Sequence, residues 1–350
     1  YQRCLKQPDL PGNQWPAGAA QARCALLRGP RMALPAVAAM LARPGGAKRL
    51  DAHYARAMKD HYEDPSQPEA LALEYWLWDG SPEVGRVAER WLRQAPDSPY
   101  AMVALGNHLV ARGLEIRGGR IAKDTPDSQM VGMEQLFQRA RPMLKRAHNL
   151  QPKLTPACVS LYAIAFYTAD ITLSRAVVER CRATDPASWE MFSDRQWWAA
   201  AEGWGSDREL GKTFDDIRAL QGQHPLLASL AVEVEQARGF RSAAMGEYLK
   251  YGQALGPAAL QRVHPGIIMH AGMRAFQQHD YLRAEVFLTQ ALRFLPKDSR
   301  AWYRRALIRE AAGRGAEALA DARRAQQQGS KSPELQQLLA RLQSGAPRAQ

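Results

Sequence analysis

The chain has 350 residues, of which 46% are hydrophobic and 23% are charged, which is typical of globular proteins. This composition argues against a long disordered chain, and no apolar run approaches the roughly 18 residues of a membrane-spanning helix. The 47 Lys and Arg residues outnumber the 35 Asp and Glu residues, so the net charge is +12 and favours acidic partners or anionic surfaces.

The N-terminal part is predicted to be a helical cap over residues 1–64. A Pro- and Gly-rich lead precedes two amphipathic segments, which predict helices over 31–42 and 47–62. The chain begins at Tyr1 and not at Met. We therefore expect that a preceding segment was removed, as a secretory signal, a tag or a proteolytic product.

The four cysteines are expected to form two disulfides. Cys158 and Cys181 are 23 residues apart, which would bring their sulfurs together on the two arms of an antiparallel helix pair. Cys4 and Cys24 would close an N-terminal loop. An even cysteine count fits an oxidising compartment, so we expect a periplasmic or secreted protein. The alternative is a cytoplasmic protein with four buried free thiols. The absence of a C-x-x-C pair makes zinc a poor interpretation.

Residues 65–186 are predicted to form helix pairs, each followed by a proline that would end the second helix. The unit from Pro99 to Pro152 is about 20 residues too long for one pair of a 34-residue repeat. The excess is predicted to be an inserted loop at 114–130, which carries Arg117, Arg120 and Lys123 and is a candidate contact site. The other predicted helices cover 67–78, 82–94, 155–168 and 171–183.

The middle of the chain, residues 187–264, is rich in tryptophan and predicts an irregular helical segment without clean repeat spacing. Its predicted helices cover 188–203, 206–221, 225–238 and 241–254.

Residues 265–343 contain two segments that align at an offset of 34 residues, and a capping helix follows them. Small side chains recur where two helices would pack closely, a large side chain would fill the gap between units, and a proline would end the second helix. The matching residues are Ile268, Gly272, Ala284, Ala291 and Pro296 in the first segment, and Trp302, Ala306, Ala318 and Ala325 in the second. Residues 344–350 are expected to form a flexible tail.

This pattern resembles that of the tetratricopeptide repeat (TPR) family, which has a large residue at position 4, small residues at positions 8, 20 and 27, and Pro at position 32. The resemblance implies an all-α fold, a right-handed α-solenoid of helix pairs. Residues 85–175 also resemble an uncharacterised bacterial family of TPR-like proteins, a domain of unknown function, through Arg117-Gly118 and Phe137. That family implies no established activity.

The TPR resemblance also implies a groove, lined by the first helix of each pair, that binds another polypeptide. The alternative is that neighbouring helices cover these positions. Some TPR domains bind a C-terminal carboxylate with a Lys at position 5. In this chain position 5 is Val103, Val159, Met269 or Tyr303, so binding of a C-terminal carboxylate in that way is disfavoured. The candidate groove residues are Asn107, Phe166, Tyr167, Met269, Met273, Phe276, Arg300 and Tyr303.

The C-terminal residues 300–350 hold ten Lys and Arg against four acidic residues. This excess predicts either a solvated end cap or a surface for an acidic protein. Only Trp302 and Tyr303 interleave with the basic residues, so nucleic acid is disfavoured as a partner.

No motif for a nucleotide, a catalytic nucleophile or a metal is present. His53 and His61 are interpreted as a surface pair, with Asp51 and Asp60 nearby, and not as a metal site. The sequence therefore predicts a non-enzymatic protein-binding module without a cofactor or membrane span. One alternative is a bacterial immunity or adaptor protein that neutralises a secreted effector. The others are a nucleic-acid-binding protein and an enzyme whose site combines the Arg-rich loop with nearby acids.

Overall fold

The chain folds into helices throughout the part that the structure, a computed structural model, describes. These residues are 1–7, 19–67, 69–118, 122–200, 207–227, 230, 269, 272–273, 275–277, 279–330 and 332–344. Within them no strand occurs, which confirms the predicted all-α class, and none of their helices is long and apolar enough to cross a lipid bilayer. The chain divides into two compact units. The continuous unit is Arg28–Ser206, and the split unit combines Tyr1–Leu27 with Asp207–Gln350.

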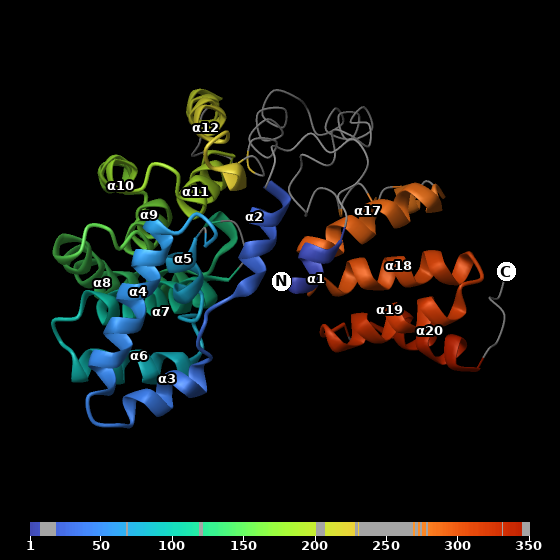
Figure 1. Cartoon of the computed structure of the whole chain (residues 1–350), viewed down its shortest axis with the longest axis horizontal. Helices are drawn as coiled ribbons and strands as arrows, with labels where there is room; N and C mark the ends of the chain where they lie inside the picture. The colour runs from blue at the N-terminus through green and yellow to red at the C-terminus, as the bar shows by residue number, and fades with distance from the viewer. Residues whose placement is uncertain are drawn as a thin grey trace. The chain divides into compact units, whose positions relative to one another are not determined.

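The continuous unit has one hydrophobic core that extends from Val37 on its first helix to Met191 on its last. Helices that are neighbours in the chain contact each other from α6 to α10. Alternate helices also touch, because α7 contacts α9 and α9 contacts α11. The α-helices, drawn in Figure 1, are α3 (Leu34–Leu41), α4 (Gly46–Glu63), α5 (Ala70–Tyr75), α6 (Pro82–Gln94), α7 (Pro99–Arg117), α8 (Asp127–Leu150), α9 (Pro156–Tyr167), α10 (Ile171–Thr184) and α11 (Trp189–Ala200).

The split unit joins the two ends of the sequence. Helix α1 contacts α2 and α17, and the guanidinium Nε of Arg293 on α17 donates a hydrogen bond to the carbonyl oxygen of Cys4 at 3.0 Å. Each helix from α17 to α20 contacts the next. The described α-helices are α1 (Gln2–Lys6), α2 (Ala19–Ala25), α12 (Asp207–Leu220), α17 (Tyr281–Phe294), α18 (Ser299–Ala311), α19 (Gly315–Gln327) and α20 (Pro333–Ser344). Short 3-10 turns occupy Leu26–Arg28, Ala122–Asp124 and Pro225–Leu227.

The same proline-containing turn connects successive helix pairs in both units. The residue before the proline leaves the helical conformation, because the proline ring would clash with it. Its φ and ψ are −138° and 71° at Ala95, −139° and 87° at Gln151, and −137° and 81° at Asp185. In each turn, its N–H donates to the carbonyl four residues earlier. The turns comprise residues 95–98, 151–154, 185–188 and 295–298.

A second recurring turn lies within the helix pairs. Ala169, His279 and Gly313 have positive φ values of 59°, 61° and 74°. The N–H of the next residue donates to the carbonyl five residues earlier, at 2.9 Å after Ala169 and His279 and at 2.8 Å after Gly313. This is the Schellman pattern that ends a helix. His279 and Gly313 are 34 residues apart, so the backbone repeats the period seen in the sequence.

Small side chains lie where the helices approach closely, as their spacing predicts. A Cβ atom added to Gly106 on α7 would lie 2.5 Å from Leu144 on α8, and one added to Gly272 would lie 2.9 Å from Leu288 on α17. The alanines at positions 20 and 27 of the two C-terminal repeats are completely buried. They are Ala284, Ala291, Ala318 and Ala325.

The structure divides the chain differently from the expected segments. Helices α3 and α4 share the core of the continuous unit, whereas residues 1–27 belong to the split unit, so the expected cap over 1–64 is not a single piece. The Trp-rich segment also contributes to both units, with α11 in one and α12 in the other. The helices predicted over 225–238 and 241–254 lie largely or wholly outside the described residues.

The expected loop at 114–130 is shorter than predicted. Helix α7 continues to Arg117 and α8 begins at Asp127, so the connection spans 118–126. The extra turns are stable because their apolar side chains, including Leu114 and Met130, pack against the core of the continuous unit. Because glycines and charged residues are interspersed with these apolar residues, the sequence pattern did not predict that the helices continue here.

Candidate functional site

In the continuous unit, the positions that the repeat register places in a groove make contacts within the unit, and α4 and α5 contact Tyr100 at the start of α7. Tyr75 on α5 donates a hydrogen bond to the carbonyl oxygen of Tyr100 at 3.3 Å, and the Tyr54 ring on α4 lies 6.4 Å from the Tyr100 ring. Val103 is completely buried. Asn107 accepts a hydrogen bond from the Ser160 hydroxyl at 2.7 Å and so joins α7 to α9. Val103 is therefore closed to a partner, and the contacts of the half-buried Tyr100 and Asn107 stabilise the unit.

The structure brings two predicted groups of site residues together at the ends of α7 and α9. The guanidinium carbon of Arg117, from the predicted loop, lies 5.0 Å from the ring centroid of Tyr167, and the Phe166 ring lies 5.2 Å from the same ring. All three side chains are half-buried. Arg120 and the side chain of Lys123 lie outside the described part of the chain.

Close to this point, buried titratable side chains join α4 and the loop before α5 to the start of α11. The Nε2 atom of His61 lies 2.9 Å from Oδ2 of Asp185, and both side chains are at least nine-tenths buried. The Oε1 atom of Glu69 accepts a hydrogen bond from the backbone N–H of Trp189 at 2.9 Å. The indole N–H of Trp76 donates to Glu190 at 3.2 Å. With Asp194, we call His61, Glu69, Asp185 and Glu190 the acidic cluster.

The acidic cluster contains polar atoms that lack a hydrogen-bond partner. The Oε2 atom of Glu69 and the Nδ1 atom of His61 are both buried and unpaired. Glu69 also has a left-handed backbone, with φ of 58°, which is costly for a residue with a Cβ atom. Buried unpaired groups and local strain often mark functional positions.

Burial and mutual repulsion shift the titration of the acidic cluster. Burial raises the pKa of Glu69 to about 7. Burial, together with the nearby Glu190, raises the pKa of Asp194 to about 8. Burial opposes protonation of His61, but the hydrogen bond to Asp185 and the surrounding carboxylates outweigh it and raise the pKa of His61. The acidic cluster therefore exchanges protons near neutral pH.

No sequence pattern predicted the acidic cluster, and the interpretation of His53 and His61 as a surface pair was wrong. His53 lies 3.0 Å from the buried Glu74, and His61 is paired with Asp185 instead of the nearby Asp60. The hydrogen-bond partner of His61, Asp185, is 124 residues away in the sequence, so no local spacing could identify it.

In the split unit, arginine and aromatic side chains from successive helices share one surface. The guanidinium carbon of Arg304 lies 5.3 Å from the Phe276 ring centroid and 5.6 Å from the Tyr303 ring centroid. Arg300, one turn earlier on α18, has a side chain that is 72% exposed. Together, Phe276, Arg300, Tyr303 and Arg304 are called the Arg–aromatic face. Of the two other predicted residues, Met269 is buried in the core and Met273 packs against it.

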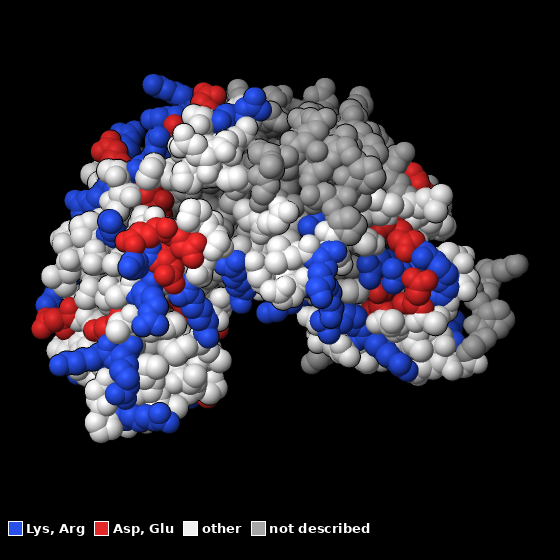
Figure 2. Space-filling view, viewed as in Figure 1, with Lys and Arg blue, Asp and Glu red and all other residues white. Residues whose placement is uncertain are grey.

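Most other arginines of the last repeat are neutralised within the split unit, which reduces the charge available to a partner. Arg305 forms two hydrogen bonds of 2.8 Å with the buried Asp321. Arg341 on α20 makes a bidentate contact with Glu310 on α18. Figure 2 shows acidic and basic side chains side by side over the C-terminal helices, where Arg309 and Arg314 both contact Glu285. Among the described residues, no carboxylate is within ion-pair distance of Arg304.

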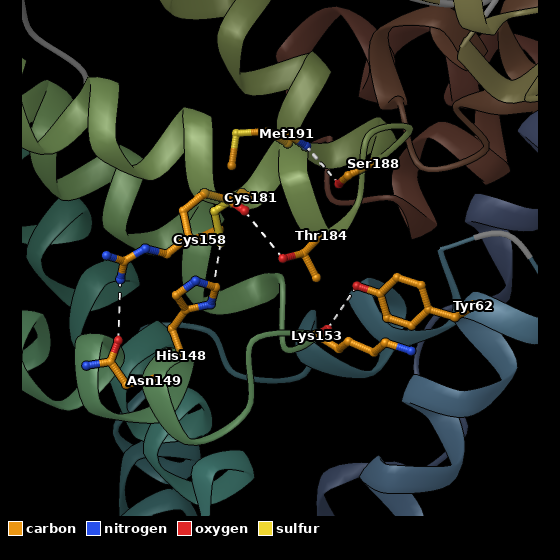
Figure 3. Close-up of a disulfide and its surroundings, with 10 residues drawn as sticks. Tyr62, His148, Asn149, Lys153, Cys158, Cys181, Thr184, Ser188 and Met191 are labelled. Atoms are coloured by element: carbon orange, nitrogen blue, oxygen red, sulfur yellow. Dashed lines mark hydrogen bonds between the residues drawn. A yellow bond between two sulfur atoms is a disulfide. The ribbon is translucent and has the colours of Figure 1, made fainter.

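The two predicted cysteine pairs are confirmed as disulfides, and no described cysteine is free. Cys4 and Cys24 join α1 to α2 with their Cα atoms 5.7 Å apart. Cys158 and Cys181 join α9 to α10 with their Cα atoms 6.2 Å apart. Figure 3 shows the imidazole of His148, on α8, next to the second disulfide.

Comparison with known proteins adds no assignment to these observations. No model of a known protein family matches the chain, and no curated protein is detectably similar to it.

Proposed function

We propose that this protein is a TPR-like helical solenoid that binds another protein, without enzymatic activity, and that the Arg–aromatic face of the split unit makes the contact. The single observation that carries the proposal is the Arg304 guanidinium, which lies close to both the Phe276 ring and the Tyr303 ring and has no carboxylate partner among the described residues. Arginine and aromatic residues dominate the energy of protein interfaces.

The recurring turns support the solenoid part of the proposal. The proline turns and the left-handed residues fall at the same repeat positions in both units, so the same local geometry is built several times along the chain. Stacked pairs of this kind provide an extended surface of side chains from successive first helices. Phe276 and Tyr303 belong to two such successive helices.

The chemistry of the Arg–aromatic face fits an acidic peptide segment with apolar side chains. Arg304 offers charge-assisted hydrogen bonds to carboxylates. The exposed Arg300, which also contacts Asp298 at 3.4 Å, adds positive charge next to it. The ring of Phe276 is half-buried and would contact an apolar residue next to the acidic one. In the continuous unit, by contrast, Val103 is completely buried and Tyr100 contacts Tyr75 on α5, so we place the contact on the split unit.

The proposal is tested by measuring binding of acidic peptides and of partners cross-linked in the native host. We expect Arg304→Ala to weaken binding by at least tenfold, as for an arginine at the centre of an interface. Arg323→Ala, which removes an exposed arginine from α19, is the matched control and should leave binding unchanged. Equal binding by both variants would contradict the role of the Arg–aromatic face.

A more specific form of the proposal is an immunity or adaptor protein in a bacterial periplasm that neutralises an acidic effector. The two disulfides support an oxidising compartment, since such bonds persist mainly outside the cytosol. A toxin or secretion gene next to the gene for this protein would support the immunity or adaptor role. The test is whether the effector encoded there binds the wild-type chain but not the Arg304→Ala variant.

A further inference from the structure

The disulfide of the continuous unit has a histidine beside it that performs no visible structural role. His148 on α8 is 3% exposed. Its Nδ1 atom lies 3.8 Å from the sulfur of Cys158, and its Nε2 atom is buried without a hydrogen-bond partner. A buried imidazole that leaves one nitrogen unpaired is costly, so its position calls for an explanation.

His148, Cys158 and Cys181 offer three metal-binding atoms in one buried place. One ligand atom from each residue lies within 4.8 Å of the other two. They come from α8, α9 and α10, which pack consecutively in one core, so the three atoms are held by the fold (Figure 3). The other disulfide, between Cys4 and Cys24, belongs to no such group among the described residues.

The distances suit coordination once the sulfur–sulfur bond is broken. With a metal–sulfur distance of about 2.3 Å, a metal–nitrogen distance of about 2.0 Å and trigonal angles, the sulfur and nitrogen atoms would lie about 3.7 Å apart. The Nδ1 atom of His148 is already 3.8 Å from the Cys158 sulfur. The two sulfurs would need to separate to about 4 Å, which a rotation of the cysteine side chains provides after reduction.

We propose that reduction of the Cys158–Cys181 disulfide creates a buried site for a thiophilic d10 metal ion, Zn²⁺ or Cu⁺, bound by His148 and both cysteines. A dithiol reductant transfers two electrons and two protons to the disulfide and becomes a disulfide itself. The ion then displaces the two thiol protons into solvent and is bound by two thiolates and one neutral imidazole. A disulfide oxidant reverses the process: it accepts two electrons from the thiolates and takes up two protons to become two thiols, the Cys158–Cys181 bond re-forms, and the ion is released into solvent.

The chemical types of the three ligands favour this role. Two thiolates and one imidazole are soft or borderline ligands, which select Zn²⁺ and Cu⁺ over Mg²⁺ or Ca²⁺. Among the described residues, no fourth His, Cys, Asp or Glu joins the group, so a Zn²⁺ ion would take a solvent molecule and a Cu⁺ ion would be three-coordinate.

The test is a metal titration of the full chain, oxidised and reduced, under anaerobic conditions. Zn²⁺ and Cu⁺ are each added in competition with a chromophoric chelator, and Co²⁺ is used as a spectroscopic probe of the zinc arm. We expect the reduced chain to bind a single equivalent that the oxidised chain does not bind. Reduced wild-type protein with Co²⁺ should show thiolate charge-transfer bands, and X-ray absorption should show both sulfur and nitrogen ligands.

Variants separate this site from the other cysteines. We expect His148→Ala to lower the metal affinity by at least tenfold while the disulfide still forms in the oxidised chain. The double variant Cys4→Ser and Cys24→Ser should keep the bound equivalent. Absence of metal binding by the reduced wild-type chain, or coordination by sulfur alone, would overturn the proposal without depending on any variant, as would full affinity in His148→Ala.

Discussion

Replacing Glu69 by Gln should stabilise the continuous unit above neutral pH, because it removes a buried negative charge. The pKa of this carboxyl rises from an ordinary 4.5 to about 7 on folding. The folded state therefore holds a proton that the unfolded state releases, and stability falls as pH rises from about 4.5 to about 7 and stays low above. The difference of about 2.5 pH units corresponds to about 3 kcal/mol.

Glutamine isolates this effect because its amide oxygen can still accept the hydrogen bond from the N–H of Trp189. Glutamine also has a Cβ atom, so the free-energy cost of the left-handed backbone at residue 69 is the same in wild type and variant and cancels in the comparison. At about pH 4, where Glu69 is protonated in both states, we expect wild type and variant to unfold at similar denaturant concentrations. At about pH 8, the variant should be more stable by up to about 3 kcal/mol.

The assay is denaturant unfolding at several pH values, with hydrogen exchange of the α5 amides to assign the transition to the continuous unit. The variant also removes a charge that raises the pKa of His61, so the pKa of His61, followed by NMR, should fall. Glu63→Gln, at a position 65% exposed on α4, is the control and should show neither effect. A constant stability difference at all pH values, with an unchanged His61 titration, would refute this account of the acidic cluster.

Three further substitutions test the packing and the turns, each by denaturant unfolding. Ala169→Gly should stabilise the chain by about 1 kcal/mol, because glycine tolerates its left-handed backbone, whereas Ala165→Gly, inside α9, should destabilise it by a similar amount. Asp321→Ala should cost about 3 kcal/mol, because it leaves the buried Arg305 without a carboxylate partner. Glu317→Ala, at a position 48% exposed, should cost less than about 0.5 kcal/mol. Gly106→Ala should cost about 1–3 kcal/mol by forcing α7 and α8 apart. An unchanged stability of Gly106→Ala would contradict the close packing of α7 and α8. Equal effects of Ala169→Gly and Ala165→Gly, or of Asp321→Ala and Glu317→Ala, would contradict the turn at Ala169 or the ion pair of Asp321.

Local rules were enough to predict much of the helical framework. Pro82 and Pro96 bound a segment whose predicted helix over 82–94 coincides with α6. Proline acts on its own neighbours, and small residues at a fixed spacing report the contact between two adjacent helices, so both signals survive in a single sequence. The cysteine pair on α9 and α10 was predictable for the same reason, since it joins adjacent helices.

Contacts between distant segments could not be predicted in this way. The acidic cluster depends on the contact of His61 with Asp185 and on that of Glu69 with Trp189, and nothing near Glu69 or His61 in the sequence identifies Asp185 or Glu190 as a neighbour. Val103, which the repeat register alone places in a groove, is completely buried. Periodicity shows which face of a helix is apolar, but it does not show which other element will bury it.

The assembly of the split unit from both ends of the sequence has a consequence for synthesis on the ribosome. Residues 28–206 emerge together and can complete their core while translation continues. Cys4 and Arg293 meet only after 289 further residues have been made, so the first helix must wait for its binding surface. Docking of α1 on α17 is therefore a late event in synthesis, and during that wait oxidation of Cys4 and Cys24 can precede it.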